Sequence, residues 1–353
     1  GSDFTEEEVL KQKLNGYVTD WEKVYGLEEY AQTLDLGSRF QKVLEAAHKL
    51  SGRRAVVLVD EYDKPVLDVL DRDGKLEEQH RDTLKAFYSV FKGADRHLQF
   101  VLLTGVTKFS QVSVFSGFNQ PDDISMDARY EALCGITQEE LDRNFAEPMA
   151  EMAAKYRCTP EEMRQKLKLQ YDGYHFGEEM TDIYNPFSLL NAFNKKFIQD
   201  YWFSSGTPTY LVRLLRHFRE NMNELTGKYY RAEQFVDYKA DVEYPLPMIY
   251  QSGYLTIKDY NQQFNTFLLD FPNNEVKCGF LTLLAADYLQ PKEETGGWIQ
   301  TLVMALQEGN TERIRDLFTA FLAGIPYTMR RKENEKERER YFQYTFYLIL
   351  RLV

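Results

Sequence analysis

Two adjacent acidic residues, Asp60 and Glu61, close a short apolar run at residues 56–59 and are the side chains best placed for chemistry. A run of this length and type predicts a buried strand of a parallel sheet. At the end of such a strand one carboxylate can hold Mg²⁺, and a second can orient the water that attacks a phosphate. This pattern favours Asp60 as a metal and cofactor ligand and Glu61 as a catalytic residue. The alternative is a strand end with two solvated acids.

A second apolar run, residues 100–104, ends at Thr104 and is followed by Lys108. Helical spacing over residues 76–92 separates the two runs, so strand, helix and strand predict a βαβ unit with a parallel sheet. Ligands bind at the carboxyl edge of such sheets. We expect Thr104 to sense a terminal phosphate and Lys108 to bind one. The alternatives are a capped strand end and a solvated loop residue.

The phosphate-binding loop that usually accompanies such acids is missing from the sequence. The pattern Gly-x-x-x-x-Gly-Lys-Ser/Thr does not occur, and the two Gly-Lys pairs, Gly74-Lys75 and Gly227-Lys228, lack its leading glycine. Since backbone N–H groups and the lysine of that loop supply most of the phosphate binding, this chain carries only part of a nucleotide site.

The composition describes a globular protein of two or three domains. The 353 residues are 43% hydrophobic and carry a net charge of −12, which opposes nonspecific binding to nucleic acid through overall charge. Three widely spaced cysteines fit a reducing cytoplasm and form neither a disulfide framework nor a zinc site. The sequence contains no run of eighteen apolar residues, so no membrane-spanning helix is expected.

The remaining sequence is mostly helical in pattern. Thr137 and Thr159 begin capping boxes completed by Glu140 and Glu162, and Asn185-Pro186 starts another helix. From residue 244 the pattern changes to a short helix, two strands and a helix, which favours a winged helix. Helices are expected at 5–50, 76–92, 138–155, from 160, 187–197, 208–221, 247–252, 276–289, 298–307, 311–323 and 341–353.

Several segments together carry a family resemblance. The stretches VVLVDEYDKPVLD, FVLLTGVTKFSQVSVFSGFNQPDDISMDARYEALCGIT, QYDGYHF, YNPFSLLNAF, YWFSSGTPTYLV and IYQSGYLTIK resemble the AAA-ATPase-like proteins of bacteria. In that family a P-loop ATPase module with a winged-helix-like segment precedes a PD-(D/E)xK nuclease-like domain. The resemblance implies ATP and Mg²⁺ as cofactors, and a phosphate loop upstream and nuclease strands downstream of the residues present here.

The resemblance implies a mainly helical α/β fold. A partial P-loop ATPase core without its phosphate loop is expected at 1–150, a helical lid at 151–235, a winged-helix-like segment at 236–290, and C-terminal helices opening the nuclease-like domain at 291–353. We expect the intact parent to hydrolyse Mg-ATP in the cytoplasm and this chain alone to be inactive. The alternative is a non-catalytic module that binds nucleic acid or protein through the winged helix, with the ATPase remnant as scaffold.

Three other sets of residues mimic functional sites. Asp270, Glu275 and Lys277 imitate a nuclease motif, but they crowd around a turn rather than lying on a central strand. Arg129 follows Asp127 and is expected to form a salt bridge more readily than to act as an arginine finger. Arg213 and Arg216 are expected on a helix surface, and the alternative is that they serve as lid arginines. The aromatic segments 171–176 and 201–203 are expected to pack in a core rather than to stack on bases.

Overall fold

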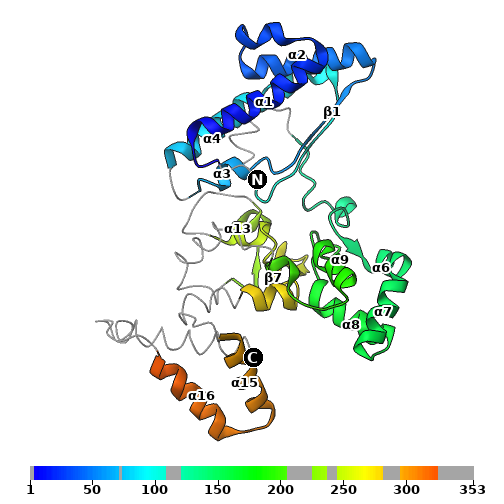
Figure 1. Cartoon of the computed structure of the whole chain (residues 1–353), viewed down its shortest axis with the longest axis vertical. Coiled ribbons are helices and arrows are strands. Elements are labelled where there is room, and N and C mark those ends of the chain that lie inside the picture. Colours follow the sequence, from blue (N-terminus) through cyan, green and yellow to red (C-terminus); the bar gives the residue numbers. More distant parts are fainter. Residues whose placement is uncertain are drawn as a thin grey trace. The chain divides into compact units, whose positions relative to one another are not determined.

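The computed structural model describes residues 4–70, 74–108, 121–204, 225–236, 245–280 and 295–324. These residues are mainly helical with three small sheets, as expected for the fold class (Figure 1). The chain divides into two compact units. The first comprises Gly1–Cys134, His175–Thr181 and Pro208–Asp270, and the second comprises Gly135–Tyr174, Asp182–Thr207 and Phe271–Val353. The four consecutive segments expected from the sequence remain a prediction.

The first unit begins with helices that pack around an aromatic core. Its elements up to the first sheet are α1 (Glu7–Tyr25), η1 (Glu28–Gln32), α2 (Leu36–Ser51), β1 (Ala55–Val59), α3 (Lys64–Leu67), α4 (Gly74–Tyr88), α5 (Val90–Gly93), η2 (Asp95–His97) and β2 (Leu98–Leu103). Phe40 of α2 stacks on Phe87 of α4 with ring centroids 4.9 Å apart. Gly52 ends α2 in the left-handed conformation and turns the chain into β1.

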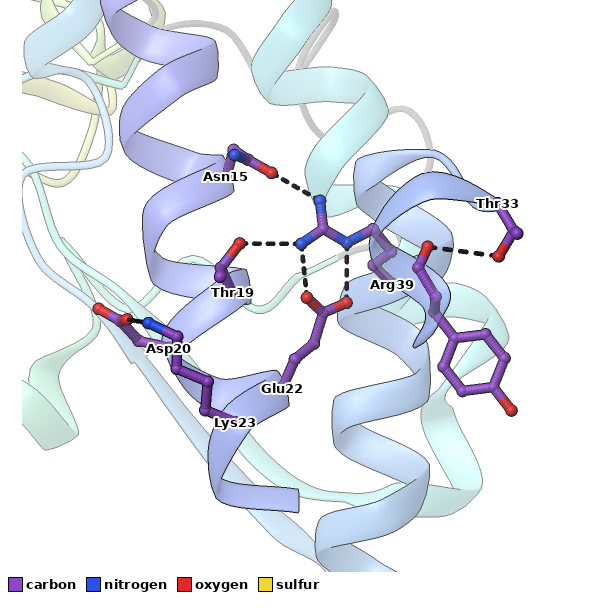
Figure 2. Close-up of polar contacts among 8 residues, drawn as sticks. Asn15, Thr19, Asp20, Glu22, Lys23, Thr33 and Arg39 are labelled. Atoms are coloured by element: carbon purple, nitrogen blue, oxygen red, sulfur yellow. Dashed lines mark hydrogen bonds and ion pairs between the residues drawn. The ribbon is translucent and has the colours of Figure 1, made fainter. Parts of the chain in front are cut away.

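A buried ion pair fastens α1 to α2 (Figure 2). The guanidinium of Arg39 donates to both carboxylate oxygens of Glu22, at 2.7 and 2.5 Å. Its remaining donors reach Asn15 Oδ1 at 2.6 Å and Thr19 Oγ1 at 3.0 Å. The side chains of Arg39 and Glu22 are only 6% and 1% exposed. Because both charges are paired and hydrogen-bonded, their burial is tolerated.

Sheet A consists of β1 and β2, which pair in parallel with Val59 opposite Leu103. The parallel pairing predicted from the βαβ pattern is confirmed. The prediction that both strands are buried is wrong, because Val56, Leu58 and Phe100 are 56%, 69% and 52% exposed. Burial alternates along β1, so only one face of this strand is covered by the described residues.

The first unit also contains an antiparallel sheet with two short helices. This part consists of β5 (Lys228–Tyr230), α12 (Ala232–Phe235), α13 (Leu246–Gln251), β6 (Thr256–Asn261) and β7 (Thr266–Asp270), and the strand order of this sheet C is β5-β7-β6. Phe235 is fully buried, with its ring against Tyr250 at 4.6 Å and Phe267 at 5.8 Å. The helix and two strands expected here are confirmed; their winged-helix identity remains a prediction.

The second unit is built from helices around a core with buried tyrosines. Thr137 and Thr159 start α6 and α8 with the predicted capping boxes, and Asn185 caps α9. Tyr171, Tyr184 and Tyr201 lie in the core, which confirms packing for the aromatic segments that contain them. The elements are β3 (Ile136–Thr137), α6 (Gln138–Asn144), α7 (Ala146–Tyr156), α8 (Pro160–Tyr171), β4 (Ile183–Tyr184), α9 (Pro186–Lys195), α10 (Tyr201–Ser204), α15 (Thr295–Gln307) and α16 (Thr311–Gly324).

Two predicted helices are divided in the structure. The helix expected over 138–155 is α6 and α7, separated at Phe145, and the helix expected over 76–92 is α4 and α5, separated at Ser89. A short turn η3 (Ala128–Tyr130) precedes the second unit. The helices expected at 208–221 and 341–353, and most of the helix expected at 276–289, lie outside the described residues.

Candidate functional site

Asp60 and Thr104 meet at the carboxyl edge of sheet A. Each follows its strand directly, and the backbone N–H of Thr104 donates to the carbonyl of Val59 at 2.8 Å, which extends the ladder by one step. The Thr104 hydroxyl donates to Asp60 Oδ1 at 2.7 Å. Both residues are exposed. The structure therefore brings together two of the four residues predicted from the sequence, from positions 44 residues apart.

Glu61 occupies an unusual backbone conformation beside Asp60. Its φ is 52°, in the left-handed region that residues other than glycine seldom adopt. The backbone N–H of Glu61 donates to Asp60 Oδ1 at 3.0 Å, and its carbonyl accepts from the N–H of Lys64 at 3.1 Å. The side chain of Glu61 is exposed. Such strained positions are often held at functional sites, where the surrounding contacts over-determine them.

Asp63 ties the loop after β1 to the loop after β2. Its Oδ2 accepts hydrogen bonds from Thr107 N at 2.5 Å and Thr107 Oγ1 at 3.0 Å. Burial raises the pKa of Asp63, against the opposing effect of the hydrogen bonds from Thr107. A Cβ atom at Gly105 would lie 2.5 Å from Asp63 Oδ1, so the crossing of the two loops requires glycine there.

The adjacent residues Asp63 and Lys64 have different partners. Asp63 is 1% exposed and joins no open acidic pocket, and Lys64 pairs with Asp68 at 3.1 Å instead of with Asp63. The local spacing of Lys64 and Asp68, four residues apart on one helical turn, explains their pairing. Asp63 thus acts as a bridge between loops.

Lys108 lies beyond Thr107 with its ammonium group already paired. Its Nζ lies 2.5 Å from Asp123 Oδ2. Partial burial acts to raise the pKa of Asp123, but hydrogen bonds from Lys108 and Ser125 outweigh it and hold this pKa below its usual value. A phosphate would have to compete with Asp123 for Lys108. The role of Lys108 in binding phosphate remains a prediction, as do the roles of Asp60, Glu61 and Thr104.

The donor set at this edge suits Mg²⁺. Among the described residues, both hydrogen bonds to the Asp60 carboxylate end on Oδ1, which leaves Oδ2 for a cation. Among the described residues no group of three or more His, Cys, Asp or Glu side chains could enclose a metal. Mg²⁺ does not require such a cage, because one or two carboxylates, water and substrate phosphates complete its shell.

Two further candidates, Arg129 and His175, have structural partners. Arg129 forms an ion pair with Asp127, as expected, and the hydrogen bonds from Arg129 lower the pKa of Asp127 to about 2. His175 donates from Nδ1 to the carbonyl of Ile257 at 2.7 Å and fastens residues 175–181 to β6. Arg213 and Arg216 lie outside the described residues.

The nuclease-like trio is dispersed over different elements. Asp270 ends β7, whereas Glu275 and Lys277 lie on a helical segment that begins at residue 274. Glu275 is fully buried and its Oε1 accepts a hydrogen bond from the backbone N–H of Trp202 at 2.7 Å. A carboxylate that holds the start of α10 in this way is a structural group. The reading of this motif as a false match stays a prediction, which the burial of Glu275 favours.

Residues 2–115 match the family model described as predicted AAA-ATPase. The chain is 37% identical over 317 residues to an uncharacterized protein in the vnfD 5′ region of Azotobacter chroococcum mcd 1, an alignment that covers 88% of this chain and 58% of that relative. The chain thus spans little more than half the length of the relative. No solved structure matches it. None of the described helices is long and apolar enough to cross a membrane. The matched part, residues 2–115, contains sheet A, the carboxyl edge and all four predicted site residues, and is similar to the AAA-ATPase-like family.

Proposed function

We propose that the whole protein binds and hydrolyses Mg-ATP at the carboxyl edge of sheet A. The observation that carries this proposal is the hydrogen bond between Thr104 and Asp60, which joins a strand-end hydroxyl to a strand-end carboxylate on neighbouring parallel strands. Ligands of open α/β sheets bind at this edge. The match of residues 2–115 to the predicted AAA-ATPase family supports the same nucleotide chemistry.

Each residue at the edge has a proposed role. Asp60 would hold Mg²⁺ through Oδ2, and the bound ion would neutralise charge on the β- and γ-phosphate oxygens. Glu61, exposed beside it, would orient the attacking water. Thr104 would sense the terminal phosphate through the hydroxyl that now donates to Asp60. Lys108 would exchange its Asp123 partner for a phosphate oxygen.

The proposal divides the activity between this chain and the rest of the whole protein. The sequence contains no phosphate loop, so we propose that other residues of the whole protein supply it and that this chain alone binds nucleotide weakly. The exposed apolar side chains Val56, Leu58 and Phe100 offer a surface on which further sheet or helix could pack. A nuclease-like domain in the whole protein belongs to the same proposal and rests on the resemblance alone.

Sheet C with α13 is the proposed winged-helix-like part, and it would respond to the nucleotide or contact a nucleic-acid or protein partner. We place this activity in the cytoplasm, where the free thiols of Cys134, Cys158 and Cys278 would stay reduced.

Calorimetric titration of ATP with Mg²⁺ into this chain and into the whole protein tests the proposal. We expect binding and hydrolysis by the whole protein, loss of hydrolysis in Glu61→Gln, and weakened Mg²⁺-dependent binding in Asp60→Asn. Asp82→Asn is a matched control, because Asp82 is an exposed acid on helix α4 and follows neither strand of sheet A. If the whole protein neither binds nor hydrolyses ATP, the enzyme reading fails and the non-catalytic binding module takes its place.

A further inference from the structure

The side chain of Gln251, the last residue of α13, joins three segments of the first unit. Its Oε1 accepts a hydrogen bond from the backbone N–H of Lys108 at 2.8 Å. Its Nε2 donates to the carbonyl oxygens of Val236 at 2.6 Å and Phe235 at 3.4 Å. These partners fix the orientation of the amide, because an N–H group must meet the oxygen and carbonyl groups must meet the nitrogen.

Gln251 acts on a peptide group that is also held from the candidate site. The carbonyl of Thr107 and the N–H of Lys108 belong to one planar peptide unit. The hydroxyl of Tyr62 donates to that carbonyl at 2.9 Å, and Gln251 accepts from that N–H at 2.8 Å. Rotation of this peptide plane therefore disturbs both hydrogen bonds together.

The Tyr62 end of this link is continuous with the carboxyl edge. The backbone N–H of Tyr62 donates to the carbonyl of Thr104 at 3.1 Å, and the Thr104 hydroxyl donates to Asp60. The Gln251 end is continuous with sheet C, because Val236 closes α12 and the neighbouring Phe235 packs against Phe267 of β7. A chain of hydrogen bonds and packed rings thus runs from Asp60 to β7.

We propose that Gln251 couples the carboxyl edge of sheet A to sheet C, so that occupation of Asp60 and Thr104 by Mg-ATP changes the stability of α12, α13 and sheet C. The coupling to nucleotide rests on the proposed function. Gln251 touches neither the nucleotide nor the metal in this scheme and is a positioning residue. A shift of the loop at Thr104 would rotate the 107–108 peptide, weaken or strengthen its bond to Gln251, and alter the carbonyl contacts that close α12.

The first test needs no nucleotide. Hydrogen exchange is measured on this chain for the wild type, Tyr62→Phe, Gln251→Ala and the double variant. Tyr62→Phe removes only the hydroxyl that holds the 107–108 carbonyl, and we expect exchange in α13 and β7 to become about fivefold faster, in line with the loss of one net hydrogen bond. In the Gln251→Ala background the same change should have no effect on α13 and β7. Equal effects in both backgrounds would overturn the coupling.

Two further variants keep this test decisive. Gln262→Ala removes an exposed glutamine from the turn between β6 and β7 and should leave the effect of Tyr62→Phe unchanged. Should Gln251→Ala fail to fold, Gln251→Glu replaces it, since a carboxylate still accepts from Lys108 but cannot donate to Val236 and Phe235. We then expect the Lys108 amide to stay protected while the response of β7 to Tyr62→Phe disappears.

The second test uses the whole protein with and without Mg-ATP. We expect the nucleotide to change exchange in β6 and β7 of the wild type by severalfold, and this change to vanish in Gln251→Ala while the Kd for ATP stays within about threefold. An unchanged response in Gln251→Ala, or no response in a wild type that binds ATP, would overturn the proposal. If the wild type binds no ATP, the proposed function and the nucleotide part of the inference fail together, whereas the first test still decides the coupling itself.

Discussion

The ion pair between Arg39 and Glu22 allows a sharp prediction about the helices that lead into sheet A. Replacing Arg39 by Met would leave the Glu22 carboxylate, 1% exposed, without its cation (Figure 2). Removing one partner of a buried pair costs about 3–5 kcal/mol, because the remaining charge stays buried. Asn15, which is exposed, and Thr19, which is partly exposed, can regain water and add little to this cost.

The double variant Glu22→Leu/Arg39→Met should behave very differently. Replacement of both charged groups by apolar side chains of similar size removes the desolvation penalty together with the attraction, so we expect stability within about 1 kcal/mol of the wild type. Because each single variant should cost at least about 3 kcal/mol, the coupling free energy between the two positions would then be about 5 kcal/mol or more, far above the few tenths found for independent sites.

Hydrogen exchange of the α1 and α2 amides is the assay, because it reports local opening in a chain of two units. A loss of about 3 kcal/mol corresponds to roughly a hundredfold faster exchange, at 1.4 kcal/mol for each factor of ten. Lys23→Met is the matched control. Its partner Asp20 lies three residues away on the same helix, and their side chains are 62% and 73% exposed (Figure 2). That change should cost about 0.5 kcal/mol or less.

Two outcomes would refute the reasoning about Arg39 and Glu22. One is an effect of Arg39→Met no larger than that of Lys23→Met. The other is a double variant that loses as much stability as the two single variants added together, since that would mean that the cost comes from lost packing rather than from an unpaired buried charge.

The remaining predictions concern three carboxylates. Because burial raises the pKa of Asp63 above 3.8, the carboxyl group keeps its proton to higher pH in the folded state than in the unfolded chain. The stability of the wild type relative to Asp63→Asn should therefore fall as pH rises from about 3.8 through the raised pKa. Urea titrations at several pH values measure this difference in stability, and a difference that does not change with pH would contradict the prediction. Thr104→Val removes a hydrogen bond to exposed Asp60, so stability should change by about 0.5 kcal/mol or less, whereas Mg-ATP binding by the whole protein should weaken about fivefold in calorimetry. Glu275→Ala removes the nearer acceptor of the Trp202 amide, at 2.7 Å, and leaves it Ser188 Oγ at 3.2 Å. The loss of this hydrogen bond should cost about 1 kcal/mol, seen as faster exchange of that amide, with a smaller loss in Glu275→Gln.

The sequence was sufficient for features that depend on neighbouring residues or on a single strand–helix–strand unit. The capping boxes at Thr137 and Thr159 need only residues three apart, and both are present. The meeting of Asp60 and Thr104 followed from parallel pairing, because strands that run the same way end at the same edge.

Features that depend on distant neighbours could not be found in this way. The apolar run of β1 predicts burial on both faces, but burial also requires a covering element, and Leu58 is 69% exposed. In the sequence Asp63 cannot be told apart from other loop acids, because its hydrogen bonds to Thr107 exist only where the two loops cross. Gln251 lies 143 residues from Lys108, and no local pattern relates the two. The glycine after Thr104 was a usable signal, since a close crossing of chains is a common reason for glycine at a strand exit.

The interleaving of the two units has a consequence for synthesis on the ribosome. The chain passes between the units at residues 134, 174, 181, 207 and 270, and the central strand of sheet C, β7, ends at Asp270, the final residue of the first unit. Domains generally fold as their residues emerge, N-terminal parts first. Here the first unit cannot close until residue 270 has left the exit tunnel, by which time residues 135–174 and 182–207 of the second are already outside. Residues of both units therefore leave the tunnel before either unit is complete, and nascent chains halted before β7 should be sensitive to protease throughout sheet C.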